Sequence, residues 1–211
     1  MAAEAQERKE LAPLAITCTR SECESDLHCF KRSRKMTPAQ VGECRSCGVR
    51  SVHWERVQRR DVNDAPFTFE ALKREWIRDH FWHNMIQEGT ELHARRKGRV
   101  GLRELAAKQL RRSVGPAQPY RDGQQTTMKD GNIIHYAQHA LACCCRACME
   151  YWHGIPKGTA LTLDQLDYFT DLVMLYVDER MPLLTETGEK IPARRHSEGK
   201  SKHGAMMGAP R

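Results

Sequence analysis

The stretch HYAQHALACCCRACMEYWHGIP, residues 135–156, places four cysteines within six positions, with histidines on either side. Four roles fit such a stretch: a disulfide, a redox-active or nucleophilic thiol, a metal site, or small apolar side chains in a core. The chain has nine cysteines, an odd number, so no complete set of intramolecular disulfides uses them all. The rest of the sequence helps to separate the remaining roles.

The expected cellular compartment bears on the chemistry of these thiols. The first residues, MAAEAQERKELAPLAIT, lack the basic and apolar regions of a secretory signal. No apolar run approaches the roughly 18 residues needed to span a bilayer. We therefore expect a cytoplasmic protein without a membrane partner. Thiols stay reduced in the cytoplasm, which favours metal ligands or reactive groups over disulfides.

Hydrophobic periodicity predicts a mainly α-helical protein behind a short cysteine-rich module. Apolar residues recur at helical spacing in FTFEALKREWIRDHFWHNMI, 67–86, and in GLRELAAKQLRRSV, 101–114. Another helix is predicted after Thr162, because Thr162 and Gln165 fit a capping box. The predicted parts are a flexible leader (1–16), a zinc-ribbon-like module with irregular or β structure (17–60), a helical domain with a second zinc-stabilised cluster (61–182), and a disordered basic tail (183–211).

The first cysteine cluster lies in the module. Cys44 and Cys47 form a C-x-x-C turn, which lets two thiolates reach one ion, and the glycine that follows suits the positive φ of such a turn. Cys18 and Cys23 supply a second pair at an accepted ligand spacing. Cys29, with His28 beside it, competes for one of these places. Five cysteines therefore contend for four positions, and the paired spacing favours zinc over an iron–sulfur cluster.

The second cluster is the stretch quoted first. Cys145 and Cys148 form another C-x-x-C, with His139 six residues before it and His153 five residues after it. The simplest prediction is a tetrahedral zinc site made by these two histidines and two cysteines. Cys144 is an alternative ligand, because it lies one helical turn from Cys148. The sequence thus predicts two zinc sites in one chain.

The second cluster also admits alternatives to this zinc site. His135 and His139 share a helix face, so His135 could be a ligand or could orient one. A redox C-x-x-C is expected at the start of a helix in a βαβ context, and no such strand pattern is visible. A catalytic thiol and metal-free core packing are further alternatives.

The same region carries a resemblance to a known family. The segments DGQQTTM, YAQHALACCCRACMEYWHGIPKG and LTLDQLDYFTDLVMLYV resemble an uncharacterised bacterial family, domain of unknown function 4186. The resemblance covers residues 115–178 and extends less strongly upstream through FWHNMI and RRKGRVGL. The resemblance brings no known activity with it. It does imply that a set of residues belongs to the shared core of the family: Gln138, His139, Cys144, Cys145, Cys148, Trp152 and His153. Cys143 falls where the family pattern tolerates a small residue other than cysteine.

The charge of the chain bears on its partners. The formal net charge is +7, and a basic balance favours phosphate-rich partners. Positive residues gather in ARRKGR, 94–99, and in the C-terminal segment 190–211. We therefore expect a zinc-binding protein that acts as a nucleic-acid-binding or protein-binding module, with its specific partner and oligomeric state left open.

A polar loop before the second cluster is the predicted functional surface. PYRDGQQT, 119–126, contains Arg121, Asp122 and Gln125, which are packed more densely than a plain connection requires. Gly123 would let the backbone approach a ligand closely. We predict ligand binding by these three side chains together with Gln138. A solvated turn is the alternative.

A zinc-dependent hydrolase is the alternative function. A C-x-x-C beside histidines, followed by WHGIPKG, resembles the metal finger of HNH nucleases. His135, His153 or Asp122 could then act as the base. HNH enzymes place a histidine directly after the C-x-x-C, whereas this chain has Met149 there. Four protein ligands would also leave zinc without an open position, which favours a structural metal.

Overall fold

The structure is a computed structural model that describes residues 16–124, 126 and 131–192. Within these residues it contains seven α-helices, three short 3-10 helices and no β-strand, which confirms the predicted mainly α class. The α-helices are α1 (Trp54–Gln58), α2 (Ala65–Lys73), α3 (Trp76–His83), α4 (Glu88–Ser113), α5 (Ile133–Ala140), α6 (Arg146–His153) and α7 (Leu163–Arg180). The 3-10 helices are η1 (Cys23–Ser25), η2 (Pro38–Gln40) and η3 (Val62–Asp64).

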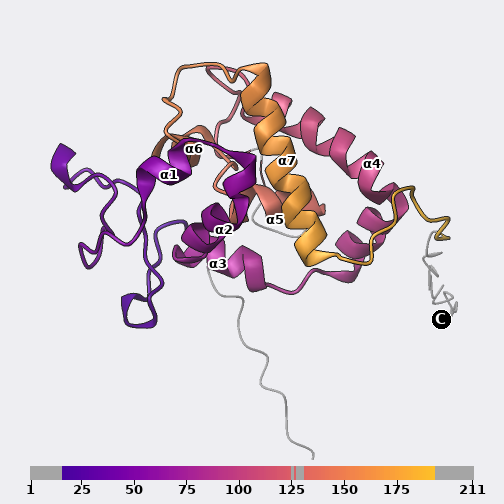
Figure 1. Cartoon of the computed structure of the whole chain (residues 1–211), viewed down its shortest axis with the longest axis horizontal. Coiled ribbons are helices and arrows are strands. Elements are labelled where there is room, and N and C mark those ends of the chain that lie inside the picture. The colour runs from indigo at the N-terminus through magenta and orange to yellow at the C-terminus, as the bar shows by residue number, and fades with distance from the viewer. Residues whose placement is uncertain (1–15, 125, 127–130, 193–211) are drawn as a thin grey trace, which may run out of the picture.

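Helix α5 lies at the centre of the helical part. It packs against α3, α4 and α7, and α4 and α7 also pack along each other (Figure 1). Every residue of α5 except His135 is buried. Helix α1 packs against α6. The irregular cysteine-rich segment, which precedes α1 in the chain, extends beyond this pair (Figure 1). None of the described helices is both long and apolar enough to cross a bilayer.

The cysteine-rich segment is built from turns and short 3-10 helices. Two isolated bridges represent its β structure in the described chain: Glu22 with Leu27, and His28 with Glu75. In the second bridge the His28 N–H donates to the Arg74 carbonyl at 2.8 Å, and the Trp76 N–H donates to the His28 carbonyl at 2.9 Å. These bonds attach the segment to the connection between α2 and α3. The four-part division of the chain stays a prediction.

The single helix expected over 67–86 is split at Glu75, which has an extended backbone and turns its carboxylate into the core. The part of α4 that follows a break at Gly98 agrees with the helix predicted over 101–114, whereas the part from Glu88 to the break was not predicted. The start of α7 is as predicted, because Thr162 and Gln165 form the reciprocal bonds of a capping box.

Helix α4 is interrupted at Gly98, whose φ of 65° and ψ of 176° are not helical. The break leaves two backbone donors without helical acceptors. The Arg99 N–H donates to the Thr185 carbonyl at 2.9 Å, and the Val100 N–H donates to the Glu186 carbonyl at 3.1 Å. Residues 183–192, which were assigned to a disordered tail, thus form a strap along α4 (Figure 1). Residues 1–15 and 193–211 lie outside the described chain.

The strap predicts a specific need for glycine at position 98. A Cβ atom there would lie 2.5 Å from the Thr187 carbonyl carbon and 2.6 Å from the Gly188 nitrogen, at a positive φ. We expect Gly98→Ala to lower the free energy of unfolding by about 2 kcal/mol or more, measured by chemical denaturation.

Gly101→Ala is the matched control in the same helix. Its Cβ would meet the Lys97 side chain at an ordinary 3.5 Å. Alanine favours the helix by up to about 1 kcal/mol, so this variant is expected to be at least as stable as the parent. Equal effects of the two substitutions would contradict the insertion of the strap at the break.

Candidate metal centres

Four side chains of the cysteine-rich segment converge on one point. The ligand atoms of Cys23, His28, Cys44 and Cys47, here called the first group, all lie within 4.8 Å of one another. The sulfurs of Cys23 and Cys44 are 3.8 Å apart, and the Cys47 sulfur lies 3.5 Å from Nδ1 of His28. Three thiols and one imidazole are a donor set typical of structural zinc.

Backbone hydrogen bonds stabilise the thiolate form of Cys44. The turn from Cys44 closes with a 2.8 Å bond from the Gly48 N–H to the Cys44 carbonyl, and Gly48 has the positive φ expected from the sequence. Burial alone would raise the pKa of Cys44. Hydrogen bonds from the backbones of Cys29, Cys47 and Ser46 outweigh this effect and lower the pKa to about 6. A thiolate is the form that binds a metal.

Asp26 orients the imidazole of the first group. Nε2 of His28 donates to Oδ1 of Asp26 at 2.9 Å, which leaves Nδ1 facing the thiols. Carboxylates commonly fix metal-binding histidines in this way. From the sequence His28 was noted only as the neighbour of Cys29, and Asp26 was given no role. The D-x-H spacing was the available signal.

Two predicted ligands, Cys18 and Cys29, lie outside the first group. Cys29 is buried, and its thiol donates to the Cys18 carbonyl at 3.6 Å. Burial raises the pKa of Cys18, and the charges of Arg78 and Cys148 also act on it. Within the described residues, neither Cys18 nor Cys29 joins a group of convergent ligand atoms.

The second group consists of Cys144, Cys145 and Cys148, whose sulfurs all lie within 4.8 Å of one another. The sulfurs of Cys144 and Cys148 are 3.6 Å apart and both residues are buried. Cys145 is half-buried at the N-cap of α6, and Cys148 lies in the first turn of that helix. Two cysteines that precede α6 and one in its first turn thus bring three sulfurs together.

A buried arginine contacts this second group. Arg78 on α3 donates to the Cys148 sulfur at 3.1 Å and lies 3.9 Å from the Cys144 sulfur. Thiol donors on Cys144 and Cys145, together with Arg78, hold the pKa of Cys148 well below its usual range. Three thiolates around a divalent cation would carry one net negative charge, and Arg78 donates to this group while it also pairs with Glu75.

Glu75 is the partner of this arginine and receives donors from three parts of the chain. Both residues are fully buried, with Nε of Arg78 at 2.9 Å from the Glu75 carboxylate. Nε1 of Trp152 donates to the same carboxylate at 2.6 Å, and the Phe30 N–H donates at 3.1 Å. The Tyr151 hydroxyl lies 3.1 Å from both carboxylate oxygens. The pair therefore connects the cysteine-rich segment, α3 and α6.

The two histidines predicted as zinc ligands are buried elsewhere. Nε2 of His153 donates to the Leu141 carbonyl at 2.8 Å, and burial lowers the pKa of His153 to about 4. His139 stacks on Phe81, with ring centroids 4.7 Å apart. Within the described residues, neither histidine joins the three sulfurs.

The predicted functional loop contributes to structure in its described part. Oδ1 of Asp122 accepts a hydrogen bond from the Arg146 N–H at 3.0 Å, so this carboxylate caps α6 from outside the helix. Arg121 is exposed and has a φ of 53°. Gln125 lies outside the described residues. Ligand binding by these side chains stays a prediction.

Gln138 is fully buried and engaged at both ends of its amide. Its oxygen accepts from Nε2 of Gln109 at 2.6 Å. Its nitrogen lies 3.2 Å from the Ser113 hydroxyl and 3.2 Å from the Cys143 carbonyl. The side chain thereby fixes the turn that leads into the second group.

A protein family described as "Domain of unknown function (DUF4186)" matches residues 67–178 of the chain. The matched segment includes Glu75, Arg78 and the second group, whereas the first group precedes it. No solved structure matches the chain.

The first group predicts which side chains hold its metal. We expect His28→Ala to retain less bound metal than the parent, because it removes one of four convergent donors. Cys29→Ala, the adjacent buried position, should retain full metal content. Elemental analysis of protein purified without chelators measures both. Loss of metal in Cys29→Ala but not in His28→Ala would reverse the assignment.

The buried pair predicts a large asymmetry between two glutamates. Glu75→Ala leaves Arg78 buried without its carboxylate, which costs about 3–5 kcal/mol in comparable cases. Glu70→Ala removes an exposed carboxylate that pairs with Lys73 at 2.9 Å, and stability should not change measurably. Chemical denaturation compares the two variants. A stable Glu75→Ala protein would mean that the pair contributes little.

Proposed function

Because the chain belongs to the DUF4186 family, whose description gives no activity, we propose a function from its own side chains: a zinc-stabilised protein that binds nucleic acid. Zinc in the first group would be held by three thiolates and one imidazole. Zinc in the second group would be held by three thiolates beside Arg78. Both ions would stabilise the fold and position the basic run 31–35 beside α6.

The observation that carries the proposal is a run of basic side chains that are not neutralised by ion pairs. The run KRSRK, 31–35, follows directly on Cys29 and Phe30 and faces α6, which carries the second group. Lys31, Arg32 and Arg34 form no ion pair with any described residue. Cations of this kind are available to phosphates.

The basic run ARRKGR, which the sequence offered for the same role, is largely engaged within the protein. Arg95 pairs with Glu189 at 2.6 Å, and Arg99 pairs with Asp178 at 2.5 Å. The Arg96 guanidinium donates to the carbonyls of Ile191 and Pro192. These contacts hold the strap and reduce the charge available to a partner.

A zinc-dependent hydrolase is the second candidate, since the second group offers three thiols rather than four ligands. A three-ligand site leaves a position for water. Two observations weigh against it. Cys144 and Cys148 are only 5% and 2% exposed. Two of the three candidate bases already bond elsewhere in the fold, Asp122 to the Arg146 N–H and His153 to the Leu141 carbonyl. We therefore favour structural zinc.

The proposal predicts a salt-dependent interaction centred on residues 31–35. Combining Lys31→Ala with Arg34→Ala should weaken DNA binding and reduce the slope of log K against log salt by about 2, since each phosphate contact contributes roughly one counterion. Fluorescence anisotropy over a salt series measures this change.

Arg95→Ala with Arg96→Ala removes the same charge and is the matched control, with a smaller expected change in slope. Binding that does not vary with salt, or that depends equally on both pairs, would contradict the proposal. The DNA should be recovered intact after incubation with the zinc-loaded protein. Cleavage of the DNA would favour the hydrolase.

A further inference from the structure

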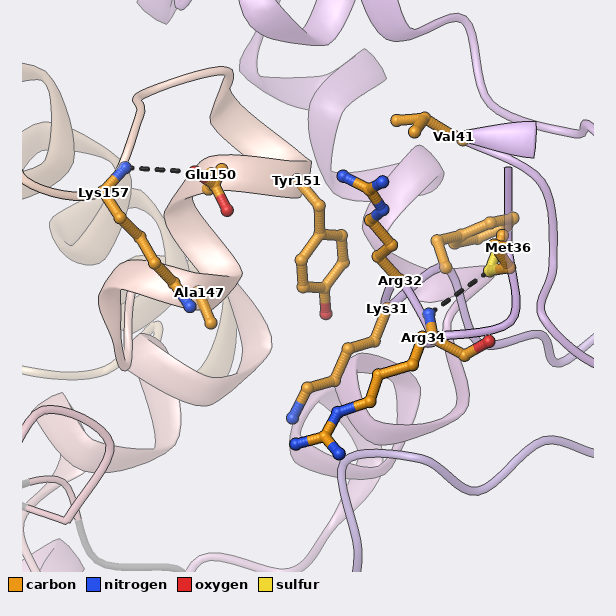
Figure 2. Close-up of a pocket in the computed structure, with 12 residues that line it drawn as sticks. Lys31, Arg32, Arg34, Met36, Val41, Ala147, Glu150, Tyr151 and Lys157 are labelled. Carbon is orange, nitrogen blue, oxygen red and sulfur yellow. Dashed lines mark hydrogen bonds between the residues drawn. The ribbon is translucent and has the colours of Figure 1, made fainter. Parts of the chain in front are cut away.

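A cavity of about 540 Å³ opens between the basic segment and α6 (Figure 2). One wall is formed by residues 30–34 and Met36, with Val41 and Gly42. The other is formed by Ala147, Glu150 and Tyr151 of α6 together with Lys157. Its volume lies within the range of about 300–1,000 Å³ that is usual for small-ligand sites.

The lining of the cavity is strongly cationic. It contains Lys31, Arg32, Arg34 and Lys157, against the single carboxylate of Glu150. Figure 2 shows the Lys31 and Arg34 side chains running side by side, with their charged ends adjacent. The Glu150 carboxylate already accepts a hydrogen bond from the Lys157 N–H at 3.1 Å. Two adjacent cations on one wall suit a phosphate oxyanion.

The cavity also has apolar surface beside these charges. Met36 and Ala147 line it, and Val41 is 47% exposed at its edge. The Tyr151 ring lies between the two walls (Figure 2), while its hydroxyl bonds to Arg78 at 2.9 Å and to Glu75. The ring is thereby held in place by the same network that contacts the second group. A fixed aromatic ring is a suitable stacking partner for a base.

We propose that this cavity binds one unpaired nucleotide of a single nucleic-acid strand, with its phosphate at Lys31 and Arg34 and its base against Tyr151 and Met36. This inference rests on the proposed function and specifies its ligand. In a duplex the bases are paired and stacked inside the helix, and they cannot enter without being extruded. The cavity therefore gives the protein a preference for single strands that charge alone would not.

The test fills the cavity without changing its charge. Ala147→Phe places a large ring on the α6 wall and leaves every cation in place. Ala160→Phe adds the same ring at an exposed position outside the cavity and is the matched control. Metal content and melting temperature verify that both variants fold. Fluorescence anisotropy then compares a labelled single-stranded oligodeoxynucleotide with its duplex at one salt concentration.

We expect Ala147→Phe to bind the single strand about tenfold more weakly and to bind the duplex unchanged, whereas Ala160→Phe should match the parent. If the parent binds both DNA forms but Ala147→Phe keeps the parent's affinity for the single strand, the cavity proposal is overturned and the proposed function stands. If the parent binds neither form, both fail. Equal competition by a polyglutamate peptide would indicate recognition of charge alone and would also overturn the cavity proposal.

Discussion

Glu75 and Arg78 form a fully buried ion pair at the junction of the cysteine-rich segment, α3 and α6. Burying two charges is costly unless their remaining donors and acceptors are satisfied. The Glu75 carboxylate also accepts hydrogen bonds from Trp152, Tyr151 and the Phe30 N–H. The Arg78 guanidinium donates hydrogen bonds to the His139 carbonyl and the Cys148 sulfur. A single charged pair thus joins the cysteine-rich segment to two helices and to the second thiol group.

This arrangement explains how a chain with few aromatic residues, 7% of the total, supports an irregular segment of this length. The first group closes the turns of the segment. The bridge between His28 and Glu75 attaches those turns to the helical part, and Phe30 packs edge-on against Trp152 with ring centroids 5.9 Å apart. The clustered metal-ligand side chains and the helix packing therefore support each other, and the cationic cavity lies between residues 30–34 and α6.

The sequence predicted the helical class, the capping box of α7 and two places where thiols gather, because these follow from periodicity and local spacing. The choice of His28 over Cys29 did not follow, since an irregular segment has no period that selects between neighbours. Glu75 and Arg78 were missed because charged residues three apart on a helix usually face water. The stretch FEALKREWIRDHFW, 69–82, alternates apolar with charged residues, so local spacing did not single out these two. The contacts of His153 and Asp122 depend on tertiary packing, which local spacing does not encode.

We propose that clustered thiols and one imidazole hold two zinc ions in this chain. Zinc K-edge X-ray absorption on the full-length, zinc-loaded protein tests it most directly. We expect a first coordination shell dominated by sulfur at about 2.3 Å, with a minor nitrogen contribution at about 2.0 Å. A shell dominated by nitrogen and oxygen, or protein that retains no zinc, would contradict it.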